Sequence, residues 1–223
     1  MELFNTEAAI ANFGLLLGGL AVTVELTLLV FALSLVAGLL VALARLSPFR
    51  PLRATIWVYI ELIRGTPLLL QLVYIYYVLP EIGVALDAFS AGVIALTLHN
   101  AAYLSEVYRG AIVAVPYGQR DAAAALGMTP LLAMRRIILP QAIRVAIPTF
   151  GNYLIGLFKE TSLCSVITIQ EVMFRAEMSA ARNYQYFTLY TIIAVMYLAV
   201  SFPAARLVNA LERRGARGFR RTR

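Results

Sequence analysis

Long apolar segments separated by short polar stretches make up most of this sequence. The first segment, residues 8–44, contains a single charged residue, Glu25. It exceeds the ~20 residues with which an α-helix crosses a bilayer. Glycines between residues 14 and 19 suggest a break near its start. We therefore expect a short peripheral helix, followed by a membrane span over about residues 20–44.

Further apolar segments follow the first. Pro48 and Pro51 are expected to end the first helix, and Glu61, Arg64 and Pro67 interrupt the second segment. The predicted spans lie at about residues 20–44, 56–79, 88–112, 144–169 and 186–207, with a polar loop at 170–185 and a basic tail at 208–223. The pattern predicts one all-α integral membrane domain, residues 1–223, with five transmembrane helices.

The charged residues are distributed asymmetrically between the connections. Most arginines lie in the first connection, between the third and fourth spans, and in the tail, whereas acidic residues gather in the N-terminus and the other two connections. The positive-inside rule assigns the basic side to the cytoplasm. Five spans then predict an N-terminus outside and a C-terminus in the cytoplasm.

Composition excludes several classes of protein. The chain is 61% hydrophobic and 14% charged, whereas soluble domains are about one quarter charged. Its net charge of +7 would suit nucleic acid, but the basic residues lie at the ends of apolar segments, so no nucleic acid is expected as a partner. One histidine and one cysteine leave little for a membrane-embedded enzyme, a metal site or a cofactor. The sequence contains no GxxxxGK[ST] motif, so ATP-driven work would need a separate subunit.

Residues 116–140 form a distinct polar stretch between the third and fourth spans. Residues 119–126 are strong helix formers, and Gly127 occupies the place of a left-handed C-terminal residue. Thr129-Pro130 is typical of a helix start, and we expect that second helix to end before Pro140. A compact helix-corner-helix on the cytoplasmic side suits a docking device, although an amphipathic interfacial loop is the simpler alternative.

The spacing within this stretch resembles the EAA loop of ABC importer permeases, EAA-x3-G-x9-I-x-LP. The matching residues are Asp121, Ala122, Ala123, Gly127, Ile137, Leu139 and Pro140. Asp121 replaces the usual glutamate, with the same charge. In that family the loop is a coupling helix that lies in a cleft of the ATP-hydrolysing subunit. On this resemblance, the alanines would allow close approach, Gly127 would turn where a side chain would clash, and Asp121, Arg135 and Arg136 would face the partner.

Three further stretches resemble the polar amino-acid permeases of bacterial ABC importers, the histidine, glutamine, glutamate, arginine and opine group. They are Arg64-Gly-Thr-Pro-Leu-Leu-Leu-Gln71, the segment from Asn100 to Ile112, and Lys159-Glu-Thr-Ser-Leu163. The resemblance implies the type I importer permease fold in the bacterial inner membrane and transport by alternating access. It also implies a second permease subunit (identical or different), two ATP-binding subunits that hold ATP and Mg²⁺, and an extracytoplasmic solute-binding protein.

Ionisable residues within the predicted spans are candidates for the substrate pathway, because a charge in a membrane is costly and usually functional. An amino-acid zwitterion needs both a cationic and an anionic partner. The candidates are Glu61, Arg64, Asn100, Tyr103, Glu106, Lys159, Glu160, Thr161 and Ser162. The structural alternative is that the charged residues pair with one another across helices, and we expect a local ion pair between Glu61 and Arg64. His99 is expected to be a hydrogen-bonded interior residue.

A secondary transporter or channel is the alternative function, with Glu61, Glu106 and Lys159 as a proton or ion relay. It leaves the EAA spacing unexplained and lacks visible inverted repeats. Dependence on ATP rather than on ion gradients separates the two. EAA permeases also move sugars, peptides, metals and phosphonates, and only the stretches at residues 64–71 and 159–163 favour amino acids.

Overall fold

A computed structural model describes residues 4–219, with side chains up to residue 210, and this part of the chain contains helices but no strand. The α-helices are α1 (Thr6–Arg45), α2 (Arg50–Arg64), α3 (Leu68–Val73), α4 (Ala88–Ala114), α5 (Tyr117–Ala125), α6 (Pro130–Ala133), α7 (Leu139–Glu160), α8 (Val172–Asn183) and α9 (Tyr186–Phe219). The π-helices are η1 (Tyr74–Val78) and η3 (Met134–Ile138), and the 3₁₀-helices are η2 (Leu79–Ile82) and η4 (Thr161–Ile167).

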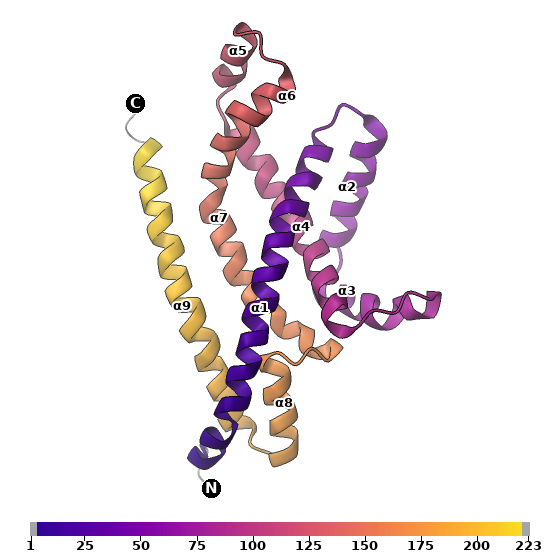
Figure 1. Ribbon diagram of the computed structural model, residues 1–223, viewed down its shortest axis with the longest axis vertical. Helices are drawn as coiled ribbons and strands as arrows, with labels where there is room; N and C mark the ends of the chain where they lie inside the picture. The colour runs from indigo at the N-terminus through magenta and orange to yellow at the C-terminus, as the bar shows by residue number, and fades with distance from the viewer. Residues whose placement is uncertain (1–3, 220–223) are drawn as a thin grey trace.

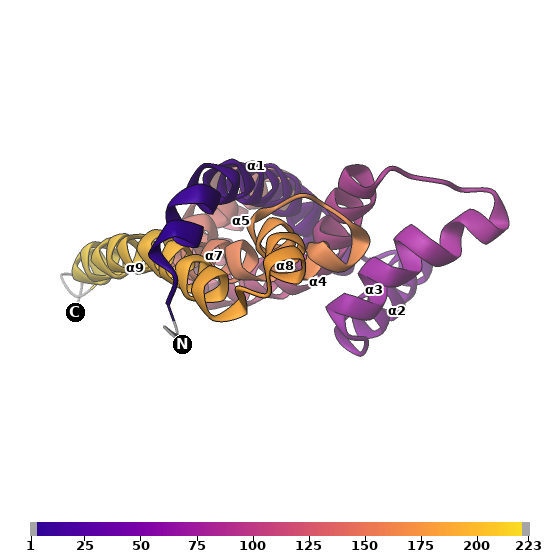
Figure 2. The same cartoon turned by 90° about the horizontal axis from the view of Figure 1, so that it is seen from below.

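The long helices α1, α4, α7 and α9 form an elongated bundle (Figure 1). The short helices α5 and α6 lie at the same end as the α1–α2 connection and the C-terminal end of α9. Helix α8 and the N-terminus lie at the opposite end. The segment after α2, residues 68–82, projects sideways from the bundle, as Figure 2 shows from below. The arginine-rich connections are therefore gathered at one end of the molecule.

Within the part of the chain whose side chains are described, two helical segments are long and apolar enough to cross a membrane, Thr6–Arg45 and Tyr186–Ala210. Helix α2 and the following segment, Leu68–Ile82, qualify as a third candidate only as a pair that is bent by 106°. The interruption expected at Pro67 within the second predicted span, residues 56–79, corresponds to this bend, because the helix turns sharply at residues 65–67. Helices α4 and α7 have 27 and 22 residues, enough in length for a span.

The prediction of a break near the start of the first segment is wrong, because α1 is a single helix of 40 residues. Its glycines serve close packing instead. A Cβ atom at residue 19 would lie 2.7 Å from the Val172 Cα atom, and one at residue 18 would lie 2.6 Å from Arg175 Nη1. These glycines let α8 approach α1, which no local signal could reveal.

Several predicted boundaries shift as well. Pro51 lies in the first turn of α2 rather than ending α1, where its missing N–H group costs nothing. The predicted polar loop at 170–185 is largely helix α8, and the fourth predicted segment, 144–169, is α7 followed by η4. The last helix continues to Phe219. The arginines of the predicted basic tail lie outside the described side chains, and residues 220–223 lie outside the described residues.

A π-turn carries the chain through a proline where we expected a helix to end. The helix before Pro140 continues from η3 into α7, and the Leu139 N–H group bonds to the Met134 carbonyl, five residues back. Leu79 bonds to Tyr74 in the same way, again directly before a proline. A proline ring clashes with the carbonyl four residues back in an α-helix, and a wider turn relieves that clash.

Candidate functional site

The corner between α5 and α6, residues 126–129, has the conformation that its sequence predicts. Gly127 is left-handed, with φ of 73°. Its N–H group bonds to the Ala124 carbonyl at 2.9 Å, and the Met128 N–H group bonds to the Ala123 carbonyl at 3.0 Å. This pair of bonds is a Schellman motif, which closes a helix with its own backbone. No atom lies within 4 Å of the place of a Gly127 Cβ atom, so the requirement for glycine is conformational within this chain, and the expected clash is absent.

The second half of the corner is also closed locally. The Thr129 hydroxyl group accepts a hydrogen bond from the Leu132 N–H group at 3.4 Å, and Pro130 occupies the first turn of α6. Ala123 and Ala133 are buried, so small side chains let the two short helices meet. The corner is therefore a rigid unit that is built from adjacent residues.

The outer surface of this unit combines exposed apolar and charged side chains. Tyr117, Leu126 and Leu131 are 75–79% exposed. The charged residues of the predicted coupling loop, Asp121, Arg135 and Arg136, are exposed and form no ion pair with any described side chain. Of its other members, Ala122 and Pro140 are exposed, and Ile137 and Leu139 are half-buried. Large apolar side chains that are exposed in one short segment together with charged ones are typical of a surface that binds another protein.

Four of the predicted pathway residues come together within the bundle. The Arg64 guanidinium lies over the Tyr103 ring, 5.6 Å from its centroid. Asn100, one turn before Tyr103 on α4, lies beside the Glu160 carboxyl group at the end of α7. We call Arg64, Tyr103, Asn100 and Glu160 the polar cluster. It contains one cation, one anion, an aromatic ring and an amide group.

The other predicted pathway residues lie outside this cluster. Glu61 and Lys159 are exposed, and the expected ion pair between Glu61 and Arg64 is not formed, since Arg64 stacks on Tyr103 instead. The Thr161 and Ser162 hydroxyl groups each donate a 2.7 Å hydrogen bond to the backbone carbonyl three residues back. Both hydroxyl groups therefore stabilise the turn from α7 into η4.

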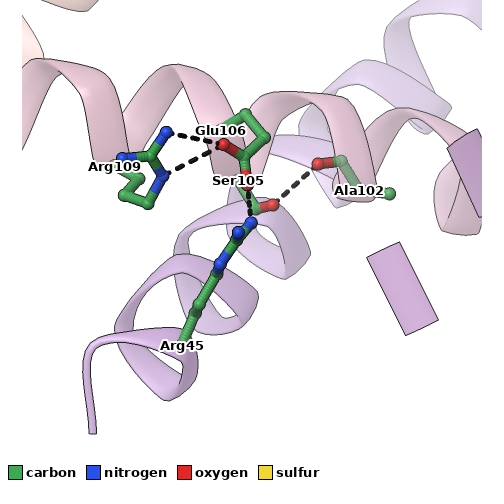
Figure 3. A network of polar contacts seen from close by, with 5 residues as sticks. All are labelled: Arg45, Ala102, Ser105, Glu106 and Arg109. Carbon is green, nitrogen blue, oxygen red and sulfur yellow. Dashed lines mark hydrogen bonds and ion pairs between the residues drawn. The ribbon is translucent and has the colours of Figure 1, made fainter. Parts of the chain in front are cut away.

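Glu106 braces two helices (Figure 3). Its carboxylate forms an ion pair with Arg45 at the end of α1 and accepts hydrogen bonds from Arg109 Nε and Nη2 at 3.0 and 2.9 Å. The pair with Arg45 ties α1 to α4 near the end of the bundle that carries the corner. Glu106 therefore pairs with a charged residue across helices, as the structural alternative to a pathway role predicts.

Sequence reasoning missed Gln71 near this site. Gln71 is the last residue of the stretch that resembles the permease signature, and this resemblance is the sequence signal that could have identified it as a site residue. His99 is buried and lies with Nδ1 3.0 Å from Gln71 Oε1, which confirms its predicted role as a hydrogen-bonded interior residue.

Known proteins resemble this chain over nearly its whole length. Residues 34–217 match the family described as the binding-protein-dependent transport system inner membrane component. The chain belongs to this family. The L-cystine transport system permease protein TcyB of Bacillus subtilis (strain 168) is 43% identical over 201 residues, which cover 90% of this chain and 86% of TcyB. The nopaline transport system permease protein NocM of Agrobacterium fabrum (strain C58 / ATCC 33970) is 37% identical over 216 residues, which cover 92% of this chain and 90% of NocM.

Solved structures agree with this membership. A crystal structure of an amino acid ABC transporter with histidines contains a chain that is 40% identical, with a TM-score of 0.86 over 92% of this chain and 96% of that one. The MetNI methionine ABC transporter in an inward-facing conformation has the same fold at 20% identity, with a TM-score of 0.73 over 90% of this chain and 98% of that one. The protein is thus an all-α permease subunit of an ABC transporter, with the predicted type I importer fold, and it acts in the membrane with separate ATPase and substrate-binding partners.

Proposed function

We propose that this chain forms the translocation pathway of an ATP-driven importer for a polar amino acid. The observation that carries the proposal is the polar cluster, in which Arg64 lies over Tyr103 and Glu160 lies beside Asn100, one turn earlier on α4. A free amino acid carries a carboxylate and an ammonium group, and this cluster offers one partner of each opposite charge. The names of relatives that transport cystine and nopaline support the same class of substrate.

The proposed topology has five spans, with the N-terminus outside and the C-terminus in the cytoplasm. The α1–α2 connection, helices α5 and α6, and the C-terminal end of α9 lie at one end of the bundle (Figure 1). Arginines lie in or next to the first two of these segments, at Arg45, Arg50, Arg53, Arg120, Arg135 and Arg136. By the positive-inside rule this end is cytoplasmic. In this topology α1, the bent α2–α3 segment, α4, α7 and α9 are the spans, in the bacterial inner membrane.

A second permease subunit, identical or different, completes the pathway. Glu61, Arg64 and Lys159 are exposed in this single chain, although their positions in the predicted spans would place them in the bilayer. Charged side chains at that depth avoid lipid and face water or protein. The surface that carries them therefore faces the second subunit across a water-filled pathway.

The corner transmits the ATPase cycle to this pathway. Its exposed patch of Tyr117, Leu126 and Leu131, with Asp121 beside it, docks in a cleft of the ATPase, and each of the two permeases engages one ATPase. ATP and Mg²⁺ are held by those ATPases, and this polypeptide performs no chemistry. Its contribution is a different fit of the pathway to inward-facing and outward-facing states, so that ATP binding shifts the population between them.

A co-purification experiment tests this proposal. The tagged protein is purified in mild detergent from its own cells, and the proteins that accompany it are identified. We expect a P-loop ATPase at a stoichiometric level and a co-purified binding protein that reveals the substrate. Arg64→Gln and Glu160→Gln are expected to retain the ATPase and to take up the amino acid measurably but much more slowly than wild type. Recovery of the chain without any ATPase would contradict the proposal.

The relay alternative is tested at Glu106. Because Arg45 and Arg109 hold its carboxylate, Glu106→Gln is expected to lower the free energy of unfolding by about 1–2 kcal/mol while amino-acid uptake continues. The matched comparison is Arg45→Gln, which removes the same pair from the other side. A Glu106→Gln protein of unchanged thermal stability that has lost uptake would favour a relay.

A further inference from the structure

The bend after α2, residues 65–67, leaves backbone carbonyl groups without helical partners. The last turn of any α-helix has four such groups, and a bilayer offers no water to bind them. Two of the carbonyl groups near the bend accept hydrogen bonds from adjacent residues. The Gly65 N–H group bonds to the Glu61 carbonyl at 2.8 Å, and the Thr66 hydroxyl group donates to the Leu62 carbonyl at 2.8 Å.

Gln71 binds the next carbonyl from beyond the bend. Its side-chain nitrogen lies 2.8 Å from the Ile63 carbonyl oxygen, 3.1 Å from the Thr66 carbonyl oxygen and 2.8 Å from the Thr66 hydroxyl group. This amide comes from α3, so one side chain joins the end of α2 to the helix that follows the bend. It also satisfies Ile63, the residue directly before Arg64.

The orientation of this amide fixes the role of His99. Carbonyl oxygens only accept hydrogen bonds, so the Gln71 atom that faces them is the donor nitrogen, and Oε1 is the acceptor. His99 Nδ1, 3.0 Å from that oxygen, must therefore carry the proton and donate it. The His99 ring contacts the Tyr103 ring with centroids 4.9 Å apart, and Arg64 lies over that same Tyr103 ring.

We propose that Gln71 and His99 are positioning residues that place the Arg64 guanidinium in the transport pathway. Gln71 acts through the Ile63 carbonyl, and His99 acts through the Tyr103 ring, so Arg64 is held from its backbone and from its side chain. Neither positioning residue needs to touch the substrate. This inference deepens the proposed function and rests on Arg64 being part of the pathway.

A double-mutant cycle tests the inference. Gln71→Leu, Arg64→Gln and the double variant are purified with their ATPase, and ATP-dependent uptake into proteoliposomes is measured. The probe is whichever of L-cystine, L-glutamine and L-arginine the wild type takes up fastest. We expect Gln71→Leu to lower uptake about tenfold, because its hydrogen bonds to Ile63, Thr66 and His99 are lost, and the double variant to be no worse than Arg64→Gln. Losses that multiply would overturn the inference, because they would show that Gln71 acts independently of Arg64.

Tyr59→Phe is the matched control in this cycle. The Tyr59 hydroxyl group donates a 2.6 Å hydrogen bond to the Leu98 carbonyl, so it also joins α2 to α4, but it bonds to none of the groups around Arg64. Its effect should multiply with that of Arg64→Gln. Replacement of His99 separates its two contacts: His99→Asn keeps a donor near the place of Nδ1 but lacks the ring that contacts Tyr103, and it is expected to lose less uptake than His99→Leu, which lacks both. His99→Leu should lose about tenfold. Equal losses in the two variants would count against the hydrogen bond.

Thiol labelling provides a readout that needs no substrate. Cys164 is buried, and Cys164→Ser yields a background into which Arg64→Cys is introduced as a single reactive thiol. Gln71→Leu should change the labelling rate of position 64 by a charged methanethiosulfonate by about tenfold, because local opening of the bend changes access. Tyr59→Phe should leave that rate unchanged. If the wild type transported none of the three amino acids, the proposed substrate class would fail, but an altered labelling rate would still support the inference that Gln71 positions residue 64. An unaltered labelling rate would overturn that inference.

Discussion

The corner at residues 126–129 and the bend at residues 65–67 contain similar residues. They differ in which groups bind the backbone N–H and carbonyl groups that each turn leaves free. Each has a glycine followed closely by Thr-Pro. In the corner, Gly127 is left-handed and Thr129 caps the next helix. In the bend, Gly65 keeps an ordinary φ of −83°, and Thr66 bonds back to the preceding helix.

The difference lies in what satisfies the freed backbone groups. Adjacent residues do so in the corner, through the Schellman bonds of Gly127 and Met128. In the bend, Gly65 and Thr66 bind two carbonyl groups locally, but the Ile63 carbonyl is bound by Gln71 of α3, which His99 of α4 holds in turn. The corner is therefore a self-contained unit that can move as one body against an ATPase. The bend depends on its neighbours, and for this reason it can respond to events in the pathway.

Removal of the bend should have the largest effect. In the double substitution Thr66→Leu and Pro67→Ala, α2 can continue straight, because the proline that costs ~3 kcal/mol inside a helix is gone. We expect amino-acid uptake to fall on the order of a hundredfold, the factor equivalent to that energy. The ATPase should still co-purify, because the corner is untouched. Thr66→Ser keeps the hydroxyl group and serves as the control, and normal uptake by the double variant would show that the bend is dispensable.

Damage to the corner should instead weaken the association with the ATPase. Leu126 is 79% exposed on its surface, and Leu126→Asp places a charge where we expect an apolar contact with the ATPase. Loss of a central contact of about 2 kcal/mol would weaken ATPase association about thirtyfold, which pull-down at several salt concentrations can measure. Phe49→Asp, an exposed apolar residue of the α1–α2 connection at the same end of the bundle, is the control. Equal ATPase recovery for Leu126→Asp and wild type would argue against docking at this surface.

Glu171 at the start of α8 extends the comparison to the other end of the molecule. It is fully buried and accepts hydrogen bonds from the Met173 and Phe174 N–H groups at 2.8 and 2.7 Å and from the Tyr197 hydroxyl group at 3.3 Å. Thr23 of α1 lies 3.5 Å away. Like the bend, this helix end is completed by side chains from distant helices.

A pH dependence of stability follows for Glu171. Burial raises the pKa of its carboxyl group from 4.5 to about 7. Between these values the folded protein holds a proton that the unfolded chain has released, so stability should fall as pH rises from about 4.5 to 7. The expected loss is on the order of 3 kcal/mol. Thermal unfolding of the detergent-solubilised protein measures it, and Glu171→Gln should remove this component. An identical pH profile for Glu171→Gln and wild type would contradict the assignment.

The smallest effect is expected at Gly127 itself. Because φ is 73° and the Cβ position is open, Gly127→Ala should cost about 1 kcal/mol of corner stability from backbone conformation alone. Gly127→Asn should cost less, since asparagine tolerates the left-handed region. Hydrogen exchange of residues 117–133 would measure both variants. A Gly127→Asn protein as perturbed as Gly127→Ala would point to a steric requirement, such as contact with the ATPase.

These contrasts explain what the sequence could predict. The corner was predictable residue by residue, because Gly127, Thr129 and Pro130 act on their immediate neighbours. The bend was visible only as an interruption at Pro67, since its brace depends on Gln71, which no local pattern ties to Ile63. The continuity of α1 was missed for the same reason.

The residues of the candidate pathway could be nominated from the sequence, but their arrangement in space could not. Intramembrane charge singled out Arg64 and Glu160, which do enter the polar cluster, but it gave equal weight to Glu106, which braces α1 against α4. Whether a charged side chain meets a partner or a pathway depends on the packing of helices that are distant in sequence. That information is absent from spacing along a single helix.

ATP-dependent uptake by the purified complex tests the central claim most directly. The permease and its co-purified ATPase would be reconstituted into proteoliposomes with the binding protein outside, and all ion gradients would be collapsed by ionophores. We predict amino-acid uptake when ATP and Mg²⁺ reach the ATPase, and none when ATP is withheld. Uptake by the permease without ATPase, driven by an imposed ion gradient, would contradict the account.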